Sequence, residues 1–151
     1  TDLLDNKCVL GIQGTPDGNV EGLCDGVILA EKDSEFLKHW LVSYQSHRSK
    51  GRDQYWAEHA VQMPFILSKQ YPELLHIEPY SSFHYPLYHS NEPTASEVGI
   101  KLMFEQDIDL PNAYCHHVWE SISWDPYLKD LSVDEIMNND TTFNRIARRF
   151  L

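Results

Sequence analysis

Two short apolar runs near the start of the chain limit the fold more than any other feature. They cover residues 8–12 and 26–30, each the length of a buried strand, and a turn-rich segment separates them. Apolar residues at 36–44 then recur at three- and four-residue spacing behind Asp33 or Ser34, which predicts a capped helix. Buried strands followed by a covering helix are typical of α/β proteins, so we expect an α/β fold.

The rest of the chain continues this alternation of strands and helices. Its patterns predict a helix bent at a proline over 55–69, a short strand over 74–77, an aromatic connection over 82–86 and a polar loop over 90–96. They then predict a helix over 100–105, a last strand over 113–119 and two capped helices, one starting at Ser132 and one at Asp140 or Thr141. The sequence has no internal repeat, and we expect one domain over residues 1–151.

Composition and charge exclude several classes of partner. Of the 151 residues, 42% are hydrophobic and 12% are aromatic, which is enough for a packed core. The formal net charge of −11 argues against binding to a nucleic-acid backbone or to an anionic membrane surface, because both require a basic face. The sequence has no apolar run approaching the roughly 20 residues that a bilayer-spanning helix needs. Its three cysteines favour buried thiols over a disulfide framework.

The segment 115–124 carries the densest chemistry of the chain. It reads Cys-His-His-Val-Trp-Glu-Ser-Ile-Ser-Trp and joins two imidazoles, two indoles, a carboxylate and two hydroxyls. Imidazole and carboxylate groups are common ligands of divalent metals. Indoles and hydroxyls are suited to stacking on sugars or bases and to hydrogen bonding with them. We interpret the segment as one wall of an active site.

Three segments together resemble glycosyltransferase family 32. The run His-Val-Trp-Glu at 117–120 is similar to the histidine–aliphatic–tryptophan–Asn/Glu element near the end of that family. Residues 23–40 resemble its segment of small and apolar residues followed by Phe-Leu and Trp, and residues 56–72 resemble its Trp-to-Pro passage. The three matches run in family order over roughly residues 8–125.

The resemblance implies a fold, a reaction and a missing part. Members have the GT-A fold and transfer a sugar from a nucleotide-sugar donor to a glycan or lipid-linked acceptor, with retention of anomeric configuration and with Mn²⁺ or Mg²⁺. The family's Asp-x-Asp motif would fall before residue 8 of this chain. We therefore expect the chain to be the C-terminal, acceptor-side half of such a domain, with the donor-binding half upstream or on a separate chain.

The resemblance and the residue chemistry together give a candidate site. His117 is the expected metal ligand, joined by Asp107 and Asp109, a literal Asp-x-Asp that could also be a solvated acidic loop. Asp25 and Glu120 are the candidate catalytic carboxylates, although Asp25 stands where the family usually has Asn. The candidate substrate-binding residues, each of which could instead be structural, are Trp56, His59, Trp119, Ser123 and Trp124.

Three other functions compete with a transferase. A non-catalytic carbohydrate-binding module would need little more than the aromatic residues and the acidity. A metal-dependent hydrolase could use His116, His117 and His59 with a carboxylate, but neighbours on a strand point to opposite faces, so one ion would not receive both adjacent histidines. A cysteine hydrolase would use Cys115, but the sequence around Cys115 does not resemble the turn that presents a catalytic nucleophile.

Overall fold

A computed structural model describes residues 3–14, 19–86, 93–109 and 113–151, with only the backbone described at 93–97. Within these residues the chain forms a three-stranded sheet in the order β2-β1-β3. Strand β2 is antiparallel to β1, and β3 is parallel to it. The strands are β1 (Cys8–Gly14), β2 (Val20–Ala30) and β3 (His76–Glu78). The α/β fold class is confirmed, and both early strands predicted from apolar runs are present.

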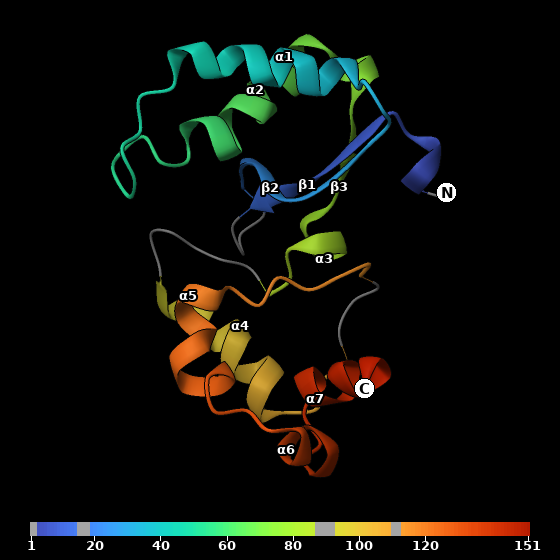
Figure 1. The fold of residues 1–151 in the computed structure, drawn as a ribbon, viewed down its shortest axis with the longest axis vertical. Coiled ribbons are helices and arrows are strands. Elements are labelled where there is room, and N and C mark those ends of the chain that lie inside the picture. Colours follow the sequence, from blue (N-terminus) through green and yellow to red (C-terminus); the bar gives the residue numbers. More distant parts are fainter. Residues whose placement is uncertain (1–2, 15–18, 87–92, 110–112) are drawn as a thin grey trace.

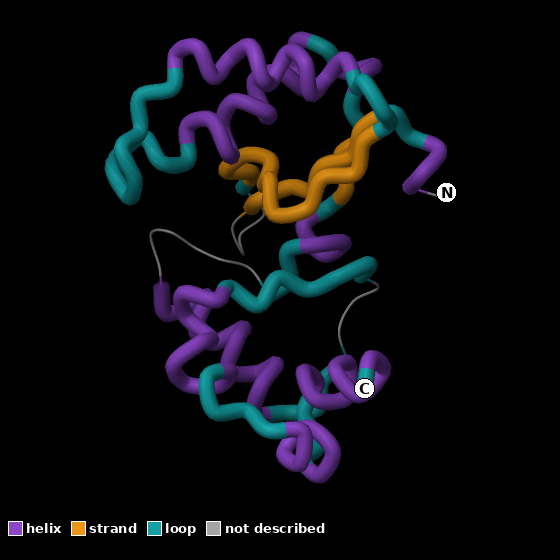
Figure 2. The backbone as a smooth tube through the Cα atoms, in the orientation of Figure 1, coloured by secondary structure: helices purple, strands orange, loops and turns teal. Residues whose placement is uncertain are grey.

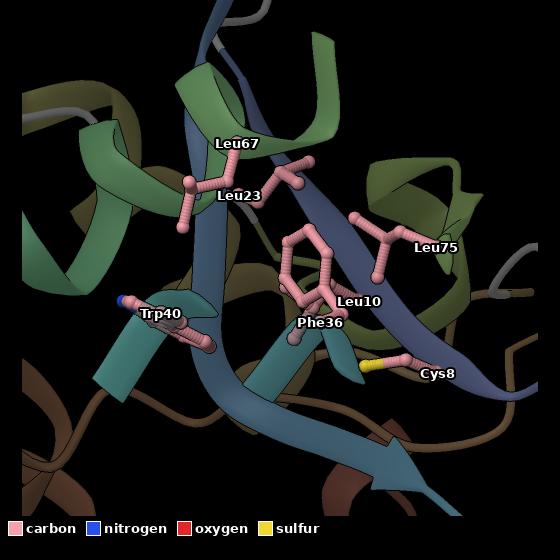
Figure 3. Close-up of a cluster of buried hydrophobic side chains, with 7 residues drawn as sticks. All are labelled: Cys8, Leu10, Leu23, Phe36, Trp40, Leu67 and Leu75. Atoms are coloured by element: carbon pink, nitrogen blue, oxygen red, sulfur yellow. The ribbon is translucent and has the colours of Figure 1, made fainter. Parts of the chain in front are cut away.

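The central strand β1 is buried on both faces. Its side chains alternate, so that Cys8 and Leu10 point toward the helices on one side and Val9 points toward the other side. Figure 3 shows the first of these clusters, in which Phe36 and Trp40 pack over the strands. The seven buried side chains of that cluster are Cys8, Leu10, Leu23, Phe36, Trp40, Leu67 and Leu75. This core fixes the sheet and the helices above it as one unit.

Helices α1 and α2 cover this face of the sheet (Figure 1). A π-helical segment, η3, runs directly into α2, whose first turn contains Pro64, so the helix predicted over 55–69 is present from Glu58 onward. The indole N–H of Trp40 on α1 donates to the His59 carbonyl of η3 at 2.7 Å, which joins the two helical segments. The segments of this layer are η1 (Leu3–Asp5), α1 (Glu35–Ser43), η2 (Tyr44–Ser46), η3 (Glu58–Gln62), α2 (Met63–Gln70) and η4 (Pro72–Leu74).

A second group of helices lies on the opposite side of the sheet (Figure 1). Its core is formed by Ile100, Met103 and Phe104, against which Trp119 also packs. The capping box predicted at Ser132 and the cap predicted at Thr141 are both confirmed. Among the described helices, none combines the length and the apolar character needed to cross a membrane. The elements are α3 (Tyr80–Phe83), α4 (Pro93–Glu105), α5 (Glu120–Ser123), η5 (Trp124–Leu128), α6 (Val133–Asn138), α7 (Thr142–Ala147) and η6 (Arg148–Phe150).

The strand predicted at 113–119 is wrong. This segment is an irregular loop that runs between the sheet and the second group of helices (Figure 2). Its last residue, Trp119, has a left-handed backbone with φ 46°, which a regular strand does not allow. Helix α5 begins directly after this loop, at Glu120.

Smaller differences concern loops. The polar loop predicted at 90–96 is helical from Pro93, and its first part lies outside the described residues. The aromatic connection at 82–86 begins inside α3. The tight turn predicted at 16–19 lies for the most part outside the described residues, and β2 begins earlier than expected, at Val20.

An irregularity in β2 interrupts its pairing with β1. Leu10 pairs with Ile28, whereas its neighbour Gly11 pairs with Cys24. Residues 25–27 are therefore extra in β2 and bulge out of the ladder. Bulges turn side chains away from the regular alternation, and here the first residue turned in this way is Asp25.

We predict that Gly22→Ala destabilises the protein by about 1–3 kcal/mol, because the added methyl group would be overpacked. A Cβ at Gly22 would lie 2.5 Å from both the carbonyl oxygen and Cγ1 of Val61, so η3 would have to move away from β2. Urea unfolding measures the change. Leu41→Ala on the exposed side of α1 is the control and should cost much less. Equal stability of Gly22→Ala and the parent would show that this close approach is absent.

Candidate functional site

A pocket of about 460 Å³ opens where the bulge of β2 meets the segment 117–121. We call it the central pocket. The sheet supplies one wall, the turn before η3 supplies the second, and the start of α5 supplies the third. Its lining residues are Gln13, Cys24, Asp25, Gly26, Arg52, Asp53, Trp56, Ala60, Val61, His117, Trp119 and Ser121. Four of the residues proposed from the sequence, which lie far apart in the chain, therefore share one cavity: Asp25, Trp56, His117 and Trp119.

Asp25 is the carboxylate that the β2 bulge directs into the central pocket. The surrounding protein partly desolvates its carboxylate and raises its pKa above the usual range. Its own backbone N–H and the nearby His117 act in the opposite direction and limit the rise. A carboxylate with a raised pKa holds a proton more readily, so Asp25 is a better general base than an ordinary aspartate.

His117 is held by Trp119 in a defined orientation. The two rings stack with centroids 3.9 Å apart and planes 26° from parallel. The backbone N–H of Trp119 donates to Nδ1 of His117 at 3.1 Å. Partial burial lowers the pKa of His117, and the charge of Asp25 opposes this only in part, so the ring is neutral at pH 7. Because Nδ1 accepts a hydrogen bond, the proton of the neutral ring is on Nε2.

Gly26 allows this ring to approach the sheet. A Cβ at Gly26 would lie 3.1 Å from Cδ2 and 3.3 Å from Nε2 of His117, which is tighter than ordinary contact. The edge of the imidazole that carries its N–H therefore rests against the β2 bulge, next to Asp25. The sheet and the loop meet at this point, which brings the Nε2–H donor of His117 next to Asp25, whose carboxylate is the acceptor.

Two indoles give the pocket its flat apolar surfaces. Trp119 packs on the core of the second helix group, and its indole N–H donates to the carbonyl of Pro86. It is thus both a core residue and a pocket residue. Trp56 is 50% exposed and lies in the turn before η3. That turn is held by Asp53, whose carboxylate accepts hydrogen bonds from the backbone N–H groups of Lys50 and Tyr55.

Several polar residues of the pocket were missed from the sequence, among them Arg52 and Gln13. Arg52 is exposed and provides a cation at the pocket wall. Gln13 is buried, and its side-chain amide donates to the Glu21 carboxylate at 3.3 Å. No motif marks either residue, because Arg52 is in a turn and Gln13 follows an apolar strand. A polar residue at the end of a buried strand is the signal that could have suggested Gln13.

The other predicted site residues lie outside the central pocket. Glu120 lines a neighbouring hollow of about 290 Å³, which Gly26, His117 and Trp119 also line. His59 is buried, with Nε2 bonded to the Ser43 carbonyl at 3.0 Å. Ser123 is buried inside α5 and donates to the Trp119 carbonyl, whereas Trp124 is exposed in η5.

The acidic pair Asp107 and Asp109 is not brought near His117. The Asp107 carboxylate accepts a hydrogen bond from Nε of Arg145 on α7 at 2.8 Å, and Asp109 is exposed two residues further along. Within the part of the chain that the structure describes, no three His, Cys, Asp or Glu side chains converge on a point that could hold a metal ion. His117 is itself a poor ligand in this orientation, because its Nε2 carries the proton. The described residues therefore do not fit the predicted metal site, and we derive no step through a metal.

The sets proposed for the two hydrolases are not assembled either. His116 forms a hydrogen bond from Nδ1 to the Tyr85 carbonyl at 3.3 Å, away from the central pocket, and His59 is buried beneath η2. Cys115 is exposed, and desolvation raises the pKa of its thiol. A raised thiol pKa reduces the thiolate that a nucleophile requires. Cys8 and Cys24 are buried free thiols, as the sequence favoured, whereas the free thiol of Cys115 is exposed and that part of the prediction is wrong.

His84 supports the pocket from behind. It is 1% exposed and lies between Gly11 of β1 and His117, with its ring centroid 6.2 Å from that of His117. Neither ring nitrogen has a hydrogen-bond partner. Burial, together with the nearby His117, lowers the pKa of His84 to about 4. The ring is therefore a neutral spacer at pH 7, and protonating it would disturb the contact between the sheet and His117.

One characterised protein is similar to this chain. Over 158 aligned positions, covering 99% of the chain, it is 30% identical to glucan organizing enzyme 1 of Cryptococcus neoformans var. grubii. The chain spans 40% of the length of that relative. No protein-family model matches the chain, and no solved structure matches it. The relationship shown is a distant one to this relative, and the resemblance to glycosyltransferase family 32 stays a prediction.

We predict that His84 makes the protein less stable in mild acid. The folded state depresses the pKa of His84 from 6.5 to about 4, so the unfolded state binds more protons between these values. The contribution of neutral His84 to the free energy of unfolding is therefore present above pH 6.5, and roughly 3 kcal/mol of it is lost as the pH falls to 4. Urea unfolding at several pH values measures the slope, and His84→Gln should reduce it. If the two proteins lose stability equally, His84 is not the group responsible.

Proposed function

We propose that the chain is the carbohydrate-binding part of a glucan-acting enzyme, and that the central pocket binds the glucan. The observation that carries the proposal is the convergence of Trp56, Trp119, Asp25 and His117 on one cavity. The apolar faces of sugar rings stack on indoles, and the hydroxyl groups of sugars form hydrogen bonds with carboxylates and N–H groups. The central pocket offers both kinds of surface within about 460 Å³.

The similar protein supports glucan as the substrate class. That protein is named glucan organizing enzyme 1, and 99% of this chain aligns with it. Because the chain spans 40% of that relative, the activity of the whole relative does not transfer to this part directly. We therefore assign to this chain the binding of carbohydrate, which the central pocket could perform without the rest of such an enzyme.

The finer proposal is that the reaction is a sugar transfer to a glucan hydroxyl. The hydroxyl oxygen forms a bond to the anomeric carbon of a nucleotide-sugar donor. Its proton passes to the carboxylate of Asp25, whose raised pKa suits a general base. The bond between the anomeric carbon and the diphosphate oxygen breaks, and the nucleoside diphosphate leaves with the electron pair of that bond. His117 donates a hydrogen bond from Nε2 and orients a sugar oxygen next to Asp25.

The donor's contacts are less complete in the described residues. Arg52 is the cation that a diphosphate would meet at the wall of the central pocket. The Mn²⁺ or Mg²⁺ ion and the retention of configuration implied by the family resemblance stay predictions. Retention requires that the hydroxyl attack from the face that the diphosphate leaves, because a single attack from the opposite face inverts the anomeric carbon. Residues that complete a donor site would belong to other segments or to another chain.

Trp56→Ala should weaken glucan binding by about 1–2 kcal/mol, a five- to thirtyfold loss of affinity, because a stacking surface is removed. Calorimetric titration with a panel of α- and β-linked gluco-oligosaccharides measures the affinity. Trp124→Ala is a closely matched control, because Trp124 is also 50% exposed but lies outside the central pocket.

Different results would lead to different conclusions. Equal affinities of Trp124→Ala and the parent, with a loss in Trp56→Ala, support the pocket. If Trp124→Ala loses affinity and Trp56→Ala keeps it, the glucan binds elsewhere. If the parent binds no gluco-oligosaccharide, the proposed function is wrong.

A further inference from the structure

Asp25 is part of two cavities. Besides the central pocket, it lines a shallow hollow of about 200 Å³. We call this the α1 hollow. Its remaining lining residues are Ile28, Leu37, Trp40, Leu41 and Tyr44. The two cavities therefore share one lining residue, Asp25, which lies in the β2 bulge.

The α1 hollow has an apolar wall that the fold leaves uncovered. Ile28 and Leu41 are exposed, although the helical spacing in the sequence placed Leu41 on the buried face of its helix. Tyr44 is 42% exposed and begins the η2 turn, just after α1. An exposed aromatic ring beside aliphatic side chains presents the type of surface on which the apolar face of a sugar stacks.

Tyr44 is also held in a fixed orientation. Its ring stacks on His47 with centroids 5.6 Å apart and planes 16° from parallel, and it lies 5.1 Å from the buried ring of His59. Desolvation and, to a lesser degree, the charge of Asp25 raise the pKa of the Tyr44 hydroxyl. The hydroxyl is therefore a neutral donor close to that carboxylate. A ring supported in this way loses little freedom when a ligand stacks on it.

We infer that the ligand is a glucan chain of at least two sugar units, which binds across both cavities with Asp25 at their junction. One unit occupies the central pocket, and the next unit of the same chain lies in the α1 hollow against Tyr44. This inference rests on the proposed function and deepens it, because it distinguishes an oligosaccharide site from a site for a single sugar. It also places the Asp25 carboxylate beside both units, where it can accept the proton of a free hydroxyl of either one.

The test compares affinity with chain length. Calorimetric titration of the whole chain uses glucose and gluco-oligosaccharides of two, three and six units. For the parent, the second unit should add about five- to tenfold in affinity, as expected for one stacked ring. In Tyr44→Ala this gain should disappear while the affinity for glucose is unchanged. Tyr44→Phe keeps the ring and should keep most of the gain.

Two further variants guard against a structural explanation. Tyr80→Ala removes a tyrosine of similar exposure, 37%, which lines neither cavity, and it should behave as the parent does. Leu41→Ala shortens the exposed wall of the α1 hollow and should reduce the gain even if Tyr44→Ala fails to fold. If affinity does not rise with chain length, or if the gain survives in both Tyr44→Ala and Leu41→Ala, the inference is overturned while the central pocket stands. If no glucan binds to the parent, the proposed function and this inference both fail.

Discussion

The bulge in β2 is the constraint on which the site depends. Strand β1 is buried on both faces and fixes the register of β2 at each end, so the extra residues 25–27 must leave the ladder. Their displacement turns Asp25 outward and opens space at Gly26, against which His117 rests. The second group of helices contributes to the pocket through this contact, because Trp119 packs on their core and stacks on His117. One irregular stretch of strand thus joins the two helical layers around a cavity.

Much of the fold could be predicted from local patterns, and the failures have a common cause. The runs at 8–12 and 26–30, and the caps at Ser132 and Thr141, depend on short-range chemistry and are present as expected. The segment 113–119 reads as a strand because it is short and contains Tyr, Val and Trp, which are frequent in strands. Its conformation is instead set by distant contacts, among them the hydrogen bond from the Trp119 indole to Pro86. Long-range packing of this kind leaves no periodic signal in the sequence.

The candidate site could likewise be predicted only in part, because residue type is visible in the sequence whereas long-range packing is not. Asp25, His117 and Trp119 stand out by residue type, and the fold brings them together. Asp107 and Asp109 have the spacing of a metal motif, but Arg145 pairs with Asp107 in a different part of the molecule. Arg52 and Tyr44 carry no motif at all. Their position beside Asp25 follows from how a turn and a helix end pack against β2, which single-residue chemistry does not encode.

The central claim is that indoles from two distant segments bind a glucan in one pocket, and NMR of the indole N–H groups tests it most directly. The chain has four tryptophans, so the spectrum should contain four assignable indole signals. On titration with a gluco-oligosaccharide, the signals of Trp56 and Trp119 should shift together with one affinity, while the signal of Trp124, which lines neither cavity, stays in place. Shifts confined to Trp124, or shifts of Trp56 and Trp119 with different affinities, would contradict a shared binding pocket.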